Sequence, residues 1–163
     1  MLRYATAIKN EKQFLSLTGM DIPSFMILHK EYQKHWEKYI EKYTVSGQKR
    51  TRSHRKRSDG VLEETEDQLM FILHYLKSNA IQEHHAAAYG MRQSQCNAWI
   101  HILLELLKKT LSSLGEMPER DVRKIKGMLS GVKEIYIDGT ERDIQRPLDN
   151  EAQRRHYSGK KNS

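Results

Sequence analysis

This chain of 163 residues has little cysteine and few long apolar runs. It also has too few acidic residues to balance its basic ones. The single cysteine, Cys96, cannot form an internal disulfide, which fits a reducing cytoplasm. No stretch of eighteen apolar residues occurs, and charged and polar residues at positions 9–12 interrupt the N-terminal region before it could resemble a signal peptide. We therefore expect a soluble, cytoplasmic protein that does not associate with a membrane.

The basic residues outnumber the acidic ones by 28 to 21, which gives a net charge of +7. Such an excess favours a polyanionic partner, most commonly nucleic acid. The segment 46–60 is densely basic and has too few apolar residues to fold alone, so we predict a solvated segment. It is either a charged linker or an arm that follows DNA phosphates or enters the minor groove, and we favour the arm. Its candidate DNA contacts are Arg50, Arg52, Arg55, Lys56 and Arg57.

The N-terminal region, residues 1–45, is predicted to be helical. Residues 10–18 favour a short helix that stops at Gly19, and Asp21 with Pro23 begins a longer helix that is predicted to end at Gly47. Apolar residues recur every three or four positions on the longer helix, which we interpret as core rather than as a platform for stacking on bases. These residues are Phe25, Leu28, Tyr32, Trp36, Tyr39, Ile40 and Tyr43.

Three helix patterns follow in quick succession within the predicted domain 61–131. The first begins at Thr65-Glu66-Asp67-Gln68, which has the pattern of a capping box. Asn79 is predicted to cap a second, short helix that ends at Gly90, and Ser94 to cap a third. The predicted inward residues of the first helix are Leu69, Ile72, Leu73 and Leu76, and those of the third are Cys96, Trp99, Ile100, Leu103, Leu107 and Leu111. A short helix, a turn containing glycine and a longer helix predict a helix-turn-helix.

The N-terminal part of the third helix carries the candidate base contacts. In a helix-turn-helix this part enters the major groove, where Gln or Asn can read adenine and Arg can read guanine. The alternative interpretation is that the same residues are the solvated face of a core helix. The candidates are Arg92, Gln93, Ser94, Gln95, Asn97, Ala98 and His101.

The remaining chain predicts a further helix over 119–130, which carries Val122, Ile125 and Leu129, and then a strand. Ile135-Tyr136-Ile137 is typical of a buried strand, and Asp138 stands at its C-terminal end before Gly139. Enzymes with α/β folds often place a catalytic or metal-binding acid there. The fold class is therefore mainly α, with the beginning of an incomplete α/β domain over 132–163.

Several segments together resemble the front half of bacterial insertion-sequence transposases of the DDE superfamily, specifically the IS-five-like group whose transposase is split over two overlapping reading frames. The Asp-Gly-Thr-Glu-Arg block is the most specific of these segments. They are Phe14-x-x-Leu17-Thr18-Gly19, Phe25 with Trp36, Gly47 with Arg50 and Arg52, Asp67-Gln68-Leu69 before Phe71-Ile72-Leu73, Gly90-Met91, Gln93-Ser94, Trp99-Ile100-His101, Leu114-Gly115-Glu116, Pro118-Glu119-Arg120, Asp138-Gly139-Thr140-Glu141-Arg142 and Tyr157-Ser158-Gly159-Lys160-Lys161.

The resemblance implies that the helix-turn-helix binds double-stranded DNA at the element's terminal inverted repeats. It also implies that the C-terminal part begins a truncated ribonuclease-H-like domain, which cuts and rejoins DNA with divalent metal ions held by Asp, Asp and Glu. Asp138 matches the first of these carboxylates, so it is the candidate catalytic and metal-binding residue. The completed enzyme would use Mg²⁺ or Mn²⁺, whereas this chain alone is expected to bind DNA without cleaving it.

The sequence departs from the family pattern at Arg92, where Ser is usual, and at Asp143, where Pro is usual. The chain stops soon after Lys160-Lys161-Asn162, residues that an A-rich slippery sequence can encode. We therefore expect a first-frame product, partnered by the second-frame half or by further copies of itself, and associated with the bacterial nucleoid through DNA. The alternative is a stand-alone helix-turn-helix regulator of transposition or transcription, which leaves the Asp138 block unexplained.

Overall fold

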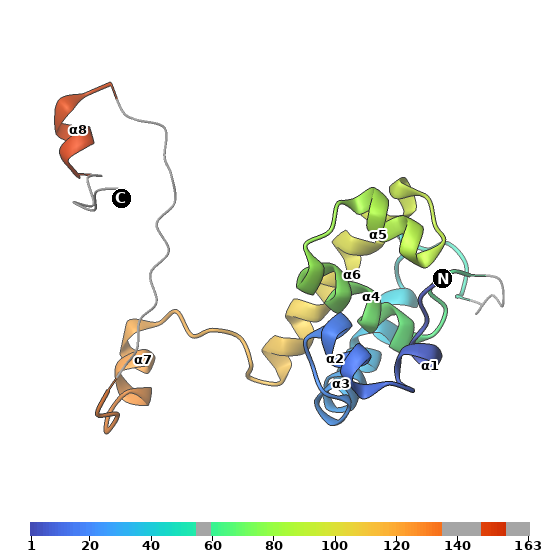
Figure 1. Ribbon diagram of the computed structural model, residues 1–163, viewed down its shortest axis with the longest axis horizontal. Helices are drawn as coiled ribbons and strands as arrows, with labels where there is room; N and C mark the ends of the chain where they lie inside the picture. Colours follow the sequence, from blue (N-terminus) through green and yellow to red (C-terminus); the bar gives the residue numbers. More distant parts are fainter. Residues whose placement is uncertain (55–59, 135–147, 156–163) are drawn as a thin grey trace. The chain divides into compact units, whose positions relative to one another are not determined.

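The regular elements in the described part of the chain are all helices. The computed structural model describes residues 1–54, 60–134 and 148–155 (Figure 1). Two units are present, Met1–Pro118 and Glu119–Ser163. The first contains α1 (Tyr4–Ala7), α2 (Glu11–Thr18), α3 (Ile22–Ile40), α4 (Thr65–Ser78), α5 (Gln82–Tyr89) and α6 (Gln93–Ser113), and the second contains α7 (Val122–Met128) and α8 (Asn150–Arg155). The mainly helical prediction is confirmed. None of these helices is long and apolar enough to cross a bilayer.

The beginnings of α2 and α3 are set by side-chain caps. Asn10 accepts a hydrogen bond from the Gln13 N–H at 3.1 Å, and Asp21 accepts one from the Ser24 N–H at 2.8 Å. These bonds satisfy backbone donors that have no partner inside the helix. Gly19 ends α2 with a φ of 72°, as predicted from the sequence.

The predicted end of α3 at Gly47 is wrong, because the helix ends at Ile40. Beyond it, Tyr43 and Lys49 form an antiparallel bridge around a turn. Thr44 holds this turn, since its N–H donates to the Gln48 carbonyl at 2.8 Å and its hydroxyl accepts from the Gln48 N–H at 3.2 Å. A threonine side chain that binds nearby backbone competes with helix formation, which explains the early end.

The aromatic face of α3 forms part of the core, as predicted. Phe25 and Tyr32 have no exposed surface, and Trp36 is buried beside Trp99 at a ring-centroid distance of 5.8 Å. Tyr43 lies beyond the helix and is 40% exposed. Because α3 packs against both α4 and α6, the N-terminal helices and the three later helices share one core.

The predicted capping box at the start of α4 is wrong. The N-cap is Glu64, which makes no side-chain capping bond. Thr65 instead hydrogen bonds to His29 Nε2 at 2.8 Å. Buried Gln68 accepts from the Tyr32 hydroxyl at 3.0 Å and donates to the Leu62 carbonyl at 3.0 Å. Both side chains therefore connect α4 to other parts of the bundle.

The inner face of α4 is wider than the sequence pattern predicts. Leu69 and Ile72 are fully buried as predicted, but Leu76 is half exposed. Met70 and Phe71 are also fully buried, although they were not predicted. The reason is that α4 packs against α2, α3 and α6, so contacts surround most of its circumference.

The turn between α5 and α6 forms where the sequence places it. Gly90 has a φ of 68°, a conformation that side chains with a Cβ rarely adopt. The predicted N-caps of α5 and α6 are both wrong. Asn79 ends α4 in the left-handed conformation instead of capping α5, and Arg92 rather than Ser94 is the N-cap of α6.

Replacing Gly90 by Ala is expected to lower the free energy of unfolding by about 1 kcal/mol, because a Cβ strains the left-handed backbone. The added Cβ would lie 2.9 Å from the end of the flexible Met1 side chain, which can move aside. Chemical denaturation measures the loss. Gly90→Asn is the control, since Asn tolerates this conformation, and an equal loss in both variants would contradict the argument.

In the second unit, α7 lies within the helix predicted over 119–130. Asp121 caps it by accepting a hydrogen bond from the Arg123 N–H at 2.9 Å. Val122 and Leu129 on this helix are exposed. The predicted strand and Asp138 fall within 135–147, which lie outside the described residues. Positions 133–134, just before them, have no regular structure.

Candidate nucleic-acid interface

Helices α4, α5 and α6 form the helix-turn-helix, and α5 packs directly on α6 (Figure 1). Ala86 is buried, and its small side chain permits a close crossing of the helices. Tyr89 is also buried and meets the Phe71 ring edge-on at a centroid distance of 4.8 Å. Burial raises the pKa of the Tyr89 hydroxyl well above its usual value. The aromatic contacts hold the short α5 firmly on α4.

His85 occupies the centre of this packing. Its ring lies 4.4 Å from Phe71 and 5.1 Å from His74, measured between centroids. Its Nε2 donates to the Phe71 carbonyl at 3.2 Å, which the neutral ring can do. Burial, together with the nearby His74, lowers the pKa of His85 to about 4. His85 is therefore a packed core histidine, whereas His84 is exposed.

Acid is expected to destabilise the bundle through His85. An unfolded histidine titrates near 6.5 and the folded one near 4, so this stability is fully present above pH 6.5 and is lost as the pH falls towards 4. The loss should reach about 2 kcal/mol at pH 5. Burial also lowers the pKa of His74, which adds a loss of stability of the same sign.

In denaturation curves at pH 7 and pH 5, His85→Phe should reduce the acid sensitivity. His84→Phe is the matched control, and an equal effect of both would contradict this origin.

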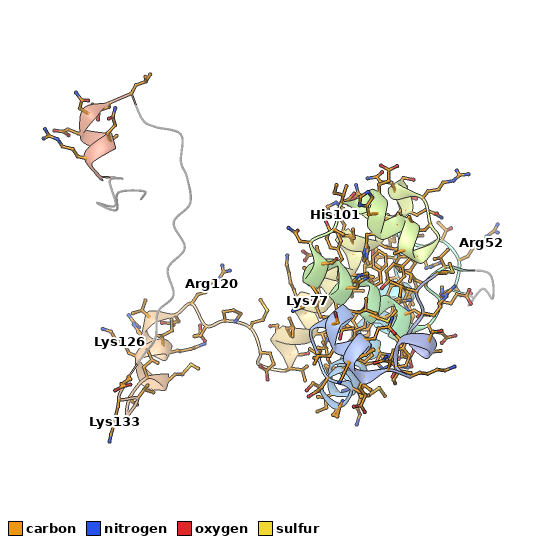
Figure 2. The ribbon with its side chains drawn as sticks, in the orientation of Figure 1. Arg52, Lys77, His101, Arg120, Lys126 and Lys133 are labelled. Atoms are coloured by element: carbon orange, nitrogen blue, oxygen red, sulfur yellow. The ribbon has the colours of Figure 1, made fainter. Side chains whose placement is uncertain are left out.

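The candidate base contacts lie in the N-terminal part of α6. Arg92, Gln93, Ser94, Gln95 and His101 are exposed, and Asn97 and Ala98 are partly exposed. Figure 2 shows the position of His101 on the bundle. The interleaved Cys96 and Ile100 point into the core. The helix therefore presents its polar edge outward and its apolar face inward, as an inserted recognition helix requires.

Two of these side chains are already engaged within the protein. Gln93 Nε2 donates to Gln82 Oε1 at 2.8 Å, which joins the first residues of α6 and α5. Gln95 Oε1 accepts from the Arg92 N–H at 3.3 Å and so satisfies a donor at the helix start. The guanidinium of Arg92 has no acceptor atom, so only this half of a capping box forms.

The turn after α3 lies beside the exposed edge of α6. A surface pocket of about 560 Å³ separates the two. Val45, Ser46 and Gly47 line one side of it, and Ala98, His101 and Ile102 line the other. Residues near the predicted arm are thus brought next to predicted base contacts on α6, a proximity that sequence spacing cannot reveal.

The first part of the predicted arm is held by local hydrogen bonds, while most of its residues are exposed. The Arg50 N–H donates to the Lys42 carbonyl at 2.8 Å, and its Nε donates to the Tyr43 carbonyl at 2.9 Å. Arg52 is exposed (Figure 2). Burial and the charge of Arg50 lower the pKa of His54. The candidates Arg55, Lys56 and Arg57 lie outside the described residues, as does Asp138.

Lys42 and Lys49 were not among the predicted contacts, although both flank the turn and are exposed. Within the described residues, neither has an acidic side chain at ion-pair distance. Their amino groups are therefore available to an anionic partner. Lys42 could not be selected from the sequence, because it lies within the segment predicted as the end of a helix.

Comparison with protein families matches residues 61–113 to the helix-turn-helix of DDE superfamily endonuclease. The matched range covers α4, α5 and α6. Comparison with curated proteins and with solved structures gives no match. The match supports a helix-turn-helix domain of the kind that accompanies DDE endonucleases, and hence DNA as the partner of this unit.

Proposed function

We propose that this chain is the DNA-binding part of a bacterial insertion-sequence transposase of the IS-five-like type, and that it recognises the terminal inverted repeats of its element. The observation that supports this most is the exposed polar edge of α6, which lies within the segment similar to the helix-turn-helix of DDE endonucleases. The resemblance of the Asp138 block to these transposases supports it independently.

In the proposed complex, the N-terminal turns of α6 enter the major groove and α5 crosses the DNA backbone. Asn97 can then accept from and donate to the edge of an adenine, and Arg92 can read guanine. Lys42, Lys49 and Arg52 contact phosphates at the side of the groove, where they add affinity without reading sequence.

Asp138 is proposed as the first carboxylate of the catalytic set. It acts only together with a second Asp and a Glu, whichever polypeptide carries them. A carboxylate oxygen is the kind of ligand that Mg²⁺ or Mn²⁺ prefers, and such ions supply Lewis acidity for phosphoryl transfer when bound. Without the other two carboxylates, the chain binds DNA and leaves it uncut.

The direct test uses duplexes copied from the two ends of the element that encodes the chain. Fluorescence anisotropy at physiological salt should show binding to these ends about 10³-fold tighter than to scrambled duplexes. Equal binding to both would contradict the proposal. Protection of promoter DNA in footprinting, with the ends left unprotected, would instead favour a stand-alone regulator.

Removing amides from the α6 edge is expected to reduce discrimination rather than overall binding. Gln95→Ala and Asn97→Ala should each lower the preference for the element end by about 1–3 kcal/mol if each contacts a base. The same anisotropy assay measures the change. Lys34→Gln on α3 is a control for general charge effects, and equal loss on end and scrambled duplexes would contradict the base-reading role.

A further inference from the structure

The hydrogen bond between Gln82 and Gln93 joins the two helices of the helix-turn-helix at their first residues. Gln93 Nε2 donates to Gln82 Oε1 at 2.8 Å, across a separation of 11 positions. Gln93 is exposed and Gln82 is partly exposed, so the bond is not needed to satisfy a buried group. Two long side chains lose rotamer freedom when they hold one geometry, so the bond fixes a conformation that each side chain alone would sample rarely.

The bond between the two amides leaves their other hydrogen-bond donors and acceptors available to DNA. A glutamine amide has two N–H donors and an oxygen with two lone pairs. After donating to Gln82, Gln93 keeps one N–H and its oxygen, which are the two groups that adenine N7 and N6–H require. Gln82 keeps both N–H donors of its own amide.

The positions of Gln93 and Gln82 suit contact with a base and with a phosphate, respectively. Gln93 begins α6, the helix whose start is proposed to face the bases. Gln82 begins α5, the helix proposed to cross the backbone, where N–H donors bind phosphate oxygens. The pair would then form a continuous chain of hydrogen bonds from a phosphate, through Gln82 and Gln93, to an adenine.

We propose that Gln82 is a specificity-determining positioning residue: it orients the Gln93 amide for an adenine in the major groove while its own amide holds a neighbouring phosphate. This inference rests on the proposed function. It assigns Gln82, which sequence reasoning did not select, a role in base discrimination without any contact to a base. It also gives the Gln93 contact a defined target, an A·T pair.

The test begins with the full chain and a library of random-sequence DNA duplexes, from which the wild-type protein selects its preferred site. Anisotropy then compares the selected duplex with duplexes in which each A·T pair is changed, or each adenine is replaced by 7-deazaadenine. Gln93→Ala should lose a preference of about 10- to 100-fold at one A·T position and little elsewhere. Gln82→Ala should lose most of the same preference at that position, and the double variant should be no less selective than Gln93→Ala.

Two further variants separate positioning from charge. Gln82→Glu keeps an acceptor for Gln93 but loses the amide donors, so it should retain the preference and bind every duplex more weakly. Glu83→Gln removes the adjacent exposed negative charge, so it should tighten binding to every duplex and leave the preference unchanged. Circular dichroism and thermal melting check that each variant is folded, which is expected because the substituted side chains lie on the surface.

The outcomes distinguish this inference from the proposed function. A wild-type chain that enriches no sequence from the library overturns both the recognition function and the pair. A chain that enriches a site, with Gln93→Ala losing no preference at any A·T pair, overturns the pair alone. Independent losses at different positions for Gln82→Ala and Gln93→Ala also overturn it. A shared loss at one A·T position supports it.

Discussion

Replacing Gln68 by Leu is expected to lower the free energy of unfolding of the helical bundle by about 2–5 kcal/mol. Gln68 is buried at the junction of α3, α4 and the segment before α4. The substitution leaves the Tyr32 hydroxyl, a buried donor, and the Leu62 carbonyl without their partners. Each unsatisfied buried group costs about 1–3 kcal/mol, because its bond to water is not replaced. Urea denaturation followed by circular dichroism measures the loss.

A double-mutant cycle shows whether the hydrogen bond or the change of shape causes the loss. Tyr32→Phe combined with Gln68→Leu removes both partners of one bond, so the double variant should be more stable than the sum of the single effects predicts. Gln33→Leu on the exposed side of α3 is the matched control and should change stability by less than about 0.5 kcal/mol. Strict additivity in the cycle would contradict the role assigned to the Tyr32–Gln68 bond.

Neutralising the basic segment is expected to weaken DNA binding about 10²-fold at physiological salt, without changing sequence preference. The variant Arg55→Gln, Lys56→Gln and Arg57→Gln would remove three expected phosphate contacts. Each contact contributes about 0.9 to the slope of log affinity against log salt, so the slope should fall by about 3. Anisotropy titrations at several salt concentrations give both the affinity and the slope.

The control carries the same change of net charge on another part of the bundle. Lys9, Lys12 and Lys30 are exposed and belong to the α1–α3 region. Replacing these three lysines by Gln should leave the salt slope nearly unchanged. If both triple variants lose affinity and slope equally, net charge rather than contact by the basic segment governs binding, and the assignment of the arm is wrong.

Local rules predicted the elements whose ends are determined by one or two residues. Asp21 and Gly19 act within a single turn of chain, and the structure places each at the helix end that the sequence indicated. Gly90 is the same kind of signal, because a sharp turn between two helices requires a positive φ. Such positions depend on neighbours in sequence, so sequence alone identifies them.

Several of the wrong predictions concern residues whose partners are distant in sequence. Thr65 and Gln68 have the spacing of a capping box, but His29 and Tyr32 compete for their side chains across the core. Full burial of Met70 follows from three helices surrounding α4, which periodicity on one helix cannot indicate.

In the candidate interface, too, some features follow from local sequence and others depend on packing between helices. The outward residues of α6 followed from amphipathic spacing, since Cys96 and Ile100 point inward between them. The turn beside α6 and the bond between Gln82 and Gln93 did not follow, because both depend on the packing of separate helices. For this reason the outward edge of α6 was predictable, whereas the adjacent turn and the Gln82–Gln93 bond were found only in the structure.

The most direct test of the central claim is amide chemical-shift mapping of the ¹⁵N-labelled chain during titration with the duplex it selects. If α6 enters the major groove, the largest changes should fall on residues 92–101, with a second group at residues 42–54 around the adjacent turn. Unchanged amides across residues 92–101, with the perturbations concentrated on α1–α3 or on the second unit, would contradict recognition by α6.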